Sequence, residues 1–150
     1  MALDDDIRIL SAVGLFEGFT QEQLRLLAFG AETTTLGAGK KLYLEDDIAD
    51  SAYVVVTGGF VLYREGSERL VVGHAGPGAI MGELALIADT RRLTSASAEV
   101  DSQALRLNRQ MFRRILEEYP QVAVQLHQRI SAELQAFLQK IESLAPRFAG

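Results

Sequence analysis

The residues best suited to bind a charged ligand lie in one short stretch, residues 78–96. Gly82-Glu83 precedes a run of apolar residues, and Arg91-Arg92 follows it. We expect a strand to lead into Gly82 and an apolar helix of about two turns to cover residues 83–88. The start of a helix offers unpaired N–H groups to an anion. An arginine from the far side of the loop can hold a phosphate with two parallel hydrogen bonds.

Glu83 adds a second requirement to this stretch. A carboxylate only accepts hydrogen bonds, so it is a poor neighbour for a phosphate unless a donor such as a ribose hydroxyl pairs with it. Ribose and phosphate held together form a nucleotide, and Gly82 would let such a ligand approach the backbone closely. A plain helix start followed by a solvated arginine pair has the same spacing, so the residues alone leave both interpretations open.

Other apparent motifs lack the residues that their chemistry requires. Residues 37–40 end like a Walker loop but without its Ser or Thr, and residues 45–56 lack the glycine and the glutamate of a calcium loop. The chain has no cysteine and two distant histidines, His74 and His127, without a visible carboxylate partner. This composition argues against a disulfide, a metal site, a haem site and a thiol nucleophile. We expect a binding protein that is not an enzyme.

The 150 residues carry a formal net charge of −5, unevenly distributed. Residues 1–50 hold 10 acids and 4 bases (net −6), residues 51–100 hold 5 and 4 (net −1), and residues 101–150 hold 5 and 7 (net +2). No segment has the concentrated basic face that direct binding to nucleic acid requires. No apolar run approaches the ~18 residues of a membrane span, and the first residues are acidic where a signal peptide is basic. We therefore expect a cytoplasmic protein that does not bind membranes.

Glycine placement separates a β-rich part from helical parts. Ten of the 13 glycines lie between Gly30 and Gly82, which favours short strands joined by tight turns. A helix is expected near the N-terminus, and Thr20 with Gln23 forms a capping box for a second one. Strands are expected at residues 33–35, 41–44, 53–56, 60–63, 70–72, 93–98 and 104–107. This spacing is typical of an antiparallel barrel or sandwich.

Two helices are expected at the C-terminal end. Asn108 is a suitable cap for a helix over residues 109–118, and Pro120 suits the first turn of a helix that could run to Leu144. Four apolar residues recur along it at spacings of four and three: Ile130, Leu134, Phe137 and Ile141. The pattern predicts a coiled-coil seam, hence a homodimer. The alternative is a helix packed on its own barrel.

Several motifs together resemble the cyclic nucleotide-binding domain family, which includes the catabolite activator protein and the regulatory subunits of protein kinase A. Residues 82–86 followed by Arg92 are similar to its phosphate-binding cassette, Gly76-Pro77-Gly78 to the turn before it, and residues 52–58 to one of its first strands. The resemblance covers almost the whole chain. It implies a mainly β fold: an antiparallel, jelly-roll-like β-roll with N-terminal helices, a short cassette helix and two C-terminal helices.

The resemblance also implies roles for individual residues. Glu83 would accept a hydrogen bond from the ribose 2′-hydroxyl, and Arg92 would pair with the cyclic phosphate. Backbone N–H groups would complete the ligand site at Gly82, Leu84, Ala85, Leu93 and Thr94. The base would lie against the roll and be capped by the C-terminal helix.

Some positions depart from the family pattern. Met81 replaces a usual Phe, Arg91 a usual Pro, and Asp46 a usual Gly, which Asp can replace because it tolerates left-handed backbone angles. Leu93 stands where Ala, Ser or Thr is common, and a Thr there is associated with cGMP preference in some members. Leu93 has no hydroxyl, so cAMP is favoured over cGMP.

We expect one domain over residues 1–150 that senses a cyclic nucleotide and signals by rearranging its C-terminal helices, to its own dimer or to a partner protein. Its expected parts are helices at 1–30, a β-roll at 31–107 with the cassette at 81–96, and helices at 108–145. The ligand is its only expected small molecule. Two alternatives stay open: the sensory part of a catabolite-activator-type regulator, although no recognition helix is expected beyond residue 144, and a degenerate domain that only dimerises.

Overall fold

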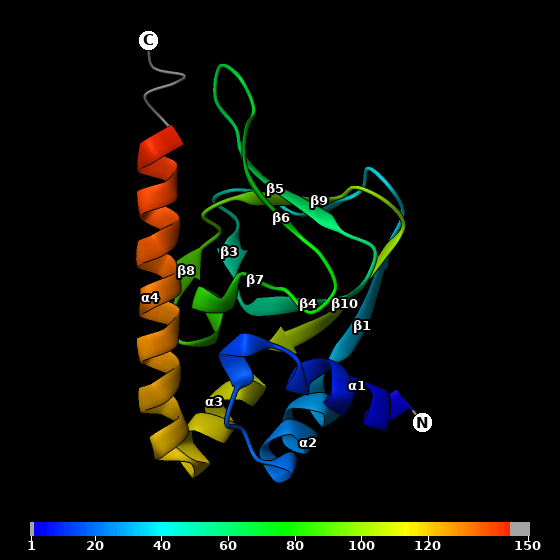
Figure 1. Cartoon of the computed structure of the whole chain (residues 1–150), viewed down its shortest axis with the longest axis vertical. Coiled ribbons are helices and arrows are strands. Elements are labelled where there is room, and N and C mark those ends of the chain that lie inside the picture. The colour runs from blue at the N-terminus through cyan, green and yellow to red at the C-terminus, as the bar shows by residue number, and fades with distance from the viewer. Residues whose placement is uncertain (1, 145–150) are drawn as a thin grey trace.

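Short antiparallel strands build a β-roll in this computed structural model, which describes residues 2–144 (Figure 1). One sheet has the strand order β1-β10-β4-β7, the other has the order β2-β9-β5-β6, and β3 pairs with β8 in a two-stranded ribbon. The sheets face each other without closing into a barrel. The strands are β1 Glu32–Leu36, β2 Lys41–Tyr43, β3 Ile48–Ala49, β4 Ser51–Thr57, β5 Phe60–Arg64, β6 Leu70–Ala75, β7 Ile80–Met81, β8 Thr90–Arg91, β9 Ser95–Ala98 and β10 Ser102–Asn108.

Helices cover one end and one side of the roll (Figure 1). The N-terminal helices and α3 lie below the β1-β10-β4-β7 sheet, and the long helix α4 runs along the side of the roll. The α-helices are α1 Ala2–Ser11, α2 Gln21–Gly30, α3 Arg109–Glu118 and α4 Pro120–Leu144, and the 3₁₀ helices are η1 Gly14–Phe16 and η2 Glu83–Leu86. Both C-terminal helices match the expected ranges, and the Asn108 side chain caps α3 by accepting from the N–H of Gln110.

Two apolar clusters meet at strand β4, which is buried on both faces. Val54 belongs to a cluster between the sheet and the helices, centred on Phe16, Phe112 and Leu126. Val55 points the other way, into a cluster inside the roll that also contains Phe60. Successive side chains of a strand alternate between faces, so β4 contributes both to the interior of the roll and to its contact with the helical layer.

Every strand expected from the sequence forms, and two short ones were missed. The acidic segment at residues 45–50, in which no strand was expected, contains β3, which pairs with β8 through Ile48 and Arg91. Each of these strands has two residues, too few for any alternation to be visible in the sequence. Their pairing closes the loop that carries the cassette.

The capping box of α2 is confirmed. The Thr20 hydroxyl accepts from the N–H of Gln23, and the Gln23 side chain accepts from the N–H of Thr20. We expect Thr20→Ala to lower the free energy of unfolding by about 1 kcal/mol, because a cap hydrogen bond is lost. Urea unfolding measures this, with Gln21→Ala, an exposed neighbour, as the control. Equal stability of the two variants would show that the box does not contribute.

Candidate functional site

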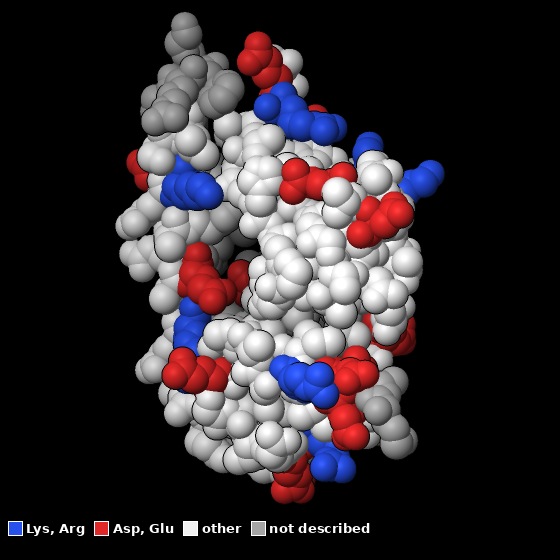
Figure 2. All heavy atoms as spheres, turned by 45° about the vertical axis from the view of Figure 1, so that its right-hand side comes forward, with Lys and Arg blue, Asp and Glu red and all other residues white. Residues whose placement is uncertain are grey.

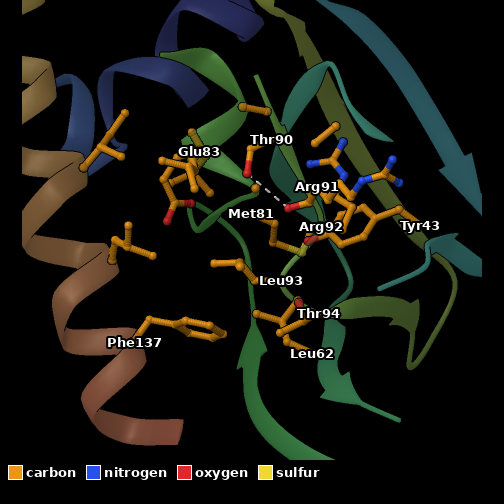
Figure 3. A pocket seen from close by; sticks show the side chains of 17 residues that line it. Tyr43, Leu62, Met81, Glu83, Thr90, Arg91, Arg92, Leu93, Thr94 and Phe137 are labelled. Carbon is orange, nitrogen blue, oxygen red and sulfur yellow. Dashed lines mark hydrogen bonds between the residues drawn. The ribbon is translucent and has the colours of Figure 1, made fainter. Parts of the chain in front are cut away.

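A pocket of about 130 Å³ lies between the β-roll, η2 and α4 (Figure 3). Figure 2 shows the corresponding hollow beside α4, with acidic atoms at its edge and basic side chains scattered over this face. The structure brings together at this pocket all seven ligand residues expected from the sequence: Gly82, Glu83, Leu84, Ala85, Arg92, Leu93 and Thr94. They come from two segments, residues 82–85 and 92–94, which are separated by six residues that include β8.

The cassette helix is shorter than expected. We expected about two turns over residues 83–88, whereas η2 is a 3₁₀ helix of four residues. The chain must reach β8 at Thr90, and burial of Ala85 and Leu86 in the core fixes the turn early. The N–H of Ala85 donates to the carbonyl of Gly82 at 3.1 Å, so it is engaged within the turn. A single tight turn also gives a weaker dipole than the expected helix.

Arg92 is buried in this pocket, with 6% of its surface exposed. Its guanidinium carbon lies 4.3 Å from the ring centroid of Tyr43, and Nη2 donates to Ser51 Oγ at 3.4 Å. Nη1 has no hydrogen-bond partner among residues 2–144, and it packs against Gly82 so closely that a β-carbon there would collide with it. A buried cation with an open donor is costly unless an anion reaches it.

Tyr43 does not supply that anion. Burial raises the pKa of Tyr43 to about 12, although the neighbouring Arg92 guanidinium acts in the opposite direction. The phenol is therefore neutral at physiological pH. Within the described part of the chain, no carboxylate lies within ion-pair distance of Arg92. Nη1 of the guanidinium is therefore available to pair with an anion that enters the pocket.

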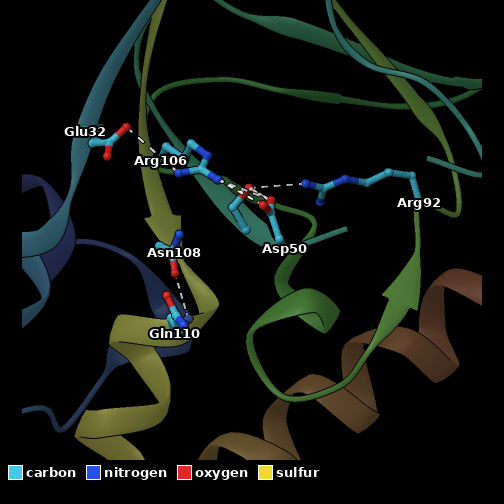
Figure 4. A network of polar contacts seen from close by, with 7 residues as sticks. Glu32, Asp50, Arg92, Arg106, Asn108 and Gln110 are labelled. Carbon is cyan, nitrogen blue, oxygen red and sulfur yellow. Dashed lines mark hydrogen bonds and ion pairs between the residues drawn. The ribbon is translucent and has the colours of Figure 1, made fainter. Parts of the chain in front are cut away.

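A chain of polar contacts stands behind Arg92 (Figure 4). Ser51 Oγ accepts from Arg92 and donates to Asp50 Oδ1 at 3.1 Å, and Asp50 accepts from Arg106 at 3.2 Å. Burial acts to raise the pKa of Asp50, but hydrogen bonds from Ser51 and Arg106 outweigh it and lower that pKa. Asp50 stays ionised, so it orients the Ser51 hydroxyl and leaves the oxygen lone pairs facing Arg92.

Glu83 points from η2 toward α4 (Figure 3). Burial, with a smaller contribution from the charge of Glu133 on α4, raises the pKa of Glu83 to about 7. The pKa of Glu133 is also raised, by burial. Sequence reasoning missed Glu133. No pattern in the sequence sets Glu133 apart from the other polar residues of α4, and its side chain is exposed in the structure.

The apolar seam of α4 faces its own domain. Ile130, Leu134 and Phe137 line the pocket, whereas Ile141 does not. The seam was expected as a dimer interface, and the structure shows three of its residues in the alternative arrangement, packed on their own roll. Arg129 fixes this helix by donating to the carbonyls of Leu15 and Glu17.

Outside the pocket, the described residues include one histidine with a carboxylate neighbour. His74 has a partner that the sequence did not reveal: its Nδ1 lies 2.9 Å from the Glu99 carboxylate on an exposed surface. In residues 2–144 no three His, Cys, Asp or Glu side chains gather as a metal site. None of the described helices is long and apolar enough to cross a membrane.

Comparisons with known proteins point to one family. The family model described as cyclic nucleotide-binding domain matches residues 33–119. A cyclic nucleotide-binding-like protein from Brucella abortus bv. 1 str. 9-941 is 58% identical, with a TM-score of 0.69, over 76% of this chain and 99% of its own. The N-terminal domain of a transcriptional regulator from Streptomyces coelicolor A3(2) is 26% identical, with a TM-score of 0.75, and the match covers 89% of this chain and 94% of that domain. A structure of cAMP-bound PfPKA-R has a TM-score of 0.82, and the match covers 96% of this chain and 48% of that one. Its sequence identity is 19%, so this likeness shows the fold alone.

The curated relatives are much longer proteins. Neuropathy target esterase sws from Drosophila ananassae is 32% identical over 93 residues, which are 61% of this chain and 6% of that protein. The shared part is small, and esterase activity is a property of those whole proteins. The family model, in contrast, spans more than half of the chain and includes Glu83 and Arg92. The chain therefore belongs to the cyclic nucleotide-binding domain family.

Proposed function

We propose that this domain binds a cyclic nucleotide, cAMP in preference to cGMP, and acts as a regulatory module. The observation that carries the proposal is the buried Nη1 of Arg92, which has no partner among the described residues. A cyclic phosphate would supply two oxygen acceptors and a negative charge at that atom. Glu83, on the next turn of the same cassette, would accept from the ribose 2′-hydroxyl.

The preference for cAMP rests on the walls around the base. Leu62, Leu93, Leu134 and Phe137 form an apolar lining that suits a purine ring. Guanine carries an exocyclic amine that would be buried against Leu93 without an acceptor, and an unmade hydrogen bond of this kind costs about 1–3 kcal/mol. Adenine does not present a donor at that position.

The small size of the pocket supports signalling through α4. Its volume of about 130 Å³ is below the roughly 300 Å³ at the lower end of ligand pockets. A nucleotide would therefore have to displace Leu134 and Phe137, and with them α4. A ligand shifts such an equilibrium only by its differential affinity for the two positions of the helix.

Homodimerisation through α4 and a cytoplasmic location belong to the same proposal. Ile130 and Leu134 face the pocket, so a dimer formed in this state would use the outer face, where Val124 and Leu138 are 61% and 49% exposed. Equilibrium sedimentation with and without cAMP tests this. The similarity to the N-terminal domain of a transcriptional regulator supports a second candidate, a sensory part of such a regulator.

Calorimetric titration with cAMP, cGMP and linear 5′-AMP tests the proposal directly. We expect cAMP to bind most tightly and 5′-AMP most weakly, because the linear phosphate carries a second negative charge and a different geometry. We expect Leu93→Thr to improve cGMP affinity by about 2- to 10-fold, the value of one added hydrogen bond, and to leave cAMP affinity nearly unchanged. Leu44→Thr, an exposed leucine outside the pocket lining, is the control. Absence of binding by all three nucleotides would contradict the proposal and favour a degenerate domain.

A further inference from the structure

Two tyrosine rings lie near the Arg92 side chain inside the roll. The guanidinium carbon of Arg92 is 4.3 Å from the ring centroid of Tyr43 and 5.8 Å from that of Tyr53. The two rings stack on each other, with their centroids 6.1 Å apart and an angle of 30° between their planes. Tyr43 belongs to β2 and Tyr53 to β4, so this aromatic pair connects the two sheets. Figure 3 shows Tyr43 beside Arg92, on the side of the pocket away from α4.

An aromatic ring holds a cation differently from a carboxylate. The ring attracts the cation with its face and takes up none of the N–H groups as an ordinary acceptor would. A carboxylate would accept from two of these N–H groups and would neutralise the charge. Arg92 donates to Ser51 from Nη2, whereas Nη1 has no hydrogen-bond partner among residues 2–144. The contact with Tyr43 therefore holds the guanidinium in place while its charge and one donor group stay available.

The backbone of Arg92 is fixed independently of its side chain. Its N–H donates to the carbonyl of Asp47 at 2.8 Å, and its carbonyl accepts from the N–H of Asp46 at 2.9 Å. The side chain still has several rotatable bonds, so the contacts at its end must select one rotamer. The hydrogen bond to Ser51 is 3.4 Å long, which is beyond the usual range for an N–H donor and an oxygen. The Tyr43 ring is therefore the main attractive contact that fixes the position of the guanidinium.

We propose that Tyr43, supported by Tyr53, is a positioning residue that holds the Arg92 guanidinium, in the ligand-free domain, at the place where the cyclic phosphate is to meet it. This inference rests on the proposed function. Without the ring, the guanidinium would adopt several rotamers, and only the fraction in the right one could bind the phosphate. The cost of ordering one long side chain corresponds to about fivefold in affinity. The role belongs to the face of the ring and not to the hydroxyl.

Calorimetric titration of the whole chain with cAMP tests this role. We expect Tyr43→Leu to bind about fivefold more weakly than the wild type, and Tyr43→Phe to bind nearly as well as the wild type because it keeps the ring. Tyr63→Leu is the matched control. Tyr63 is also buried and has Arg69 at 4.0 Å from its ring centroid, but it does not line the pocket. This variant should unfold at a lower urea concentration and keep the cAMP affinity of the wild type.

Nuclear magnetic resonance of the ¹⁵N-labelled chain reports on the contact without ligand. A proton above the face of an aromatic ring is shifted upfield by the ring current. The Nε–H signal of Arg92, identified by its absence in Arg92→Met, should therefore move downfield in Tyr43→Leu. It should stay in place in Tyr43→Phe and in Tyr63→Leu. A Tyr43 side chain that only filled space in the core would not produce this pattern.

The outcomes separate this inference from the proposed function. Wild-type cAMP affinity in Tyr43→Leu, or an unmoved Nε–H signal of Arg92 in that variant, would overturn this inference alone. An equal loss of affinity in Tyr43→Phe and Tyr43→Leu would assign the effect to the hydroxyl and would also overturn it. Tyr43→Met, with an unbranched side chain, takes the place of Tyr43→Leu if that variant does not fold. Absence of cAMP binding by the wild type would overturn the proposed function and this inference together.

Discussion

Replacement of Arg92 by Met is expected to remove nucleotide binding and to stabilise the ligand-free domain. The loss of a buried charge that pairs with the phosphate costs about 2–5 kcal/mol, at least about a 30-fold weaker affinity. Without ligand, the same guanidinium is buried with an open donor at Nη1, and Met fills its volume without a charge to desolvate. Part of the gain is offset by the lost contact with the Tyr43 ring, worth about 1 kcal/mol.

Thermal unfolding and cAMP titration of the same samples measure both effects. A net gain of about 1 kcal/mol corresponds to a melting temperature about 2–4 °C higher in a domain of this size. Arg91→Met is the matched control, because Arg91 is exposed and donates only to the carbonyl of Asp46. It should change stability by less than about 0.5 kcal/mol. A lower melting temperature for Arg92→Met would show that the guanidinium is a structural group and not one reserved for a ligand.

Local sequence signals were sufficient for most of the fold. Thr20 with Gln23, Asn108 and Pro120 act within a few residues of themselves, and each marks the helix boundary found in the structure. Asp46 was expected to tolerate a left-handed backbone, and its φ is +70°. The cassette helix was overestimated because its length is decided by the pairing of β8 with β3, which lies outside the segment itself.

Only those residues of the candidate site that lie next to one another in the sequence could be predicted. The cassette residues are neighbours in sequence, so their spacing together with the family resemblance predicted a joint role. The supporting groups come from distant strands and helices: Tyr43 from β2, Ser51 from β4 and Glu133 from α4. Their side chains carry no local pattern that distinguishes them from ordinary surface or core residues. The apolar stripe of α4 was visible in the sequence, but the surface that it packs against was not. Such a stripe has the same spacing whether it faces a second chain or its own pocket.

Gly82→Ala is expected to weaken cAMP binding about as strongly as loss of Arg92. Gly82 has a φ of +71°, a left-handed conformation that costs alanine about 1–2 kcal/mol. A β-carbon at this position would also collide with Nη1 of Arg92. Ser51 and Tyr43 hold the rest of the guanidinium. The collision would therefore turn Nη1 away from the place where the phosphate is proposed to bind. We expect lower stability together with at least about a 30-fold loss of affinity, measured by urea unfolding and calorimetry.

Gly78→Ala separates backbone strain from the collision. Gly78 has a φ of +89°, and a β-carbon added there would meet no heavy atom within 4 Å, so its substitution carries the strain alone. It should lower the free energy of unfolding by about 1–2 kcal/mol and leave cAMP affinity within about twofold of the wild type. A double-mutant cycle completes the test. With Arg92→Met in place, Gly82→Ala meets a different side chain, so its stability cost should fall toward that of Gly78→Ala. Additive costs in the cycle, or unchanged cAMP affinity in Gly82→Ala, would mean that contact between Gly82 and the guanidinium does not position Arg92.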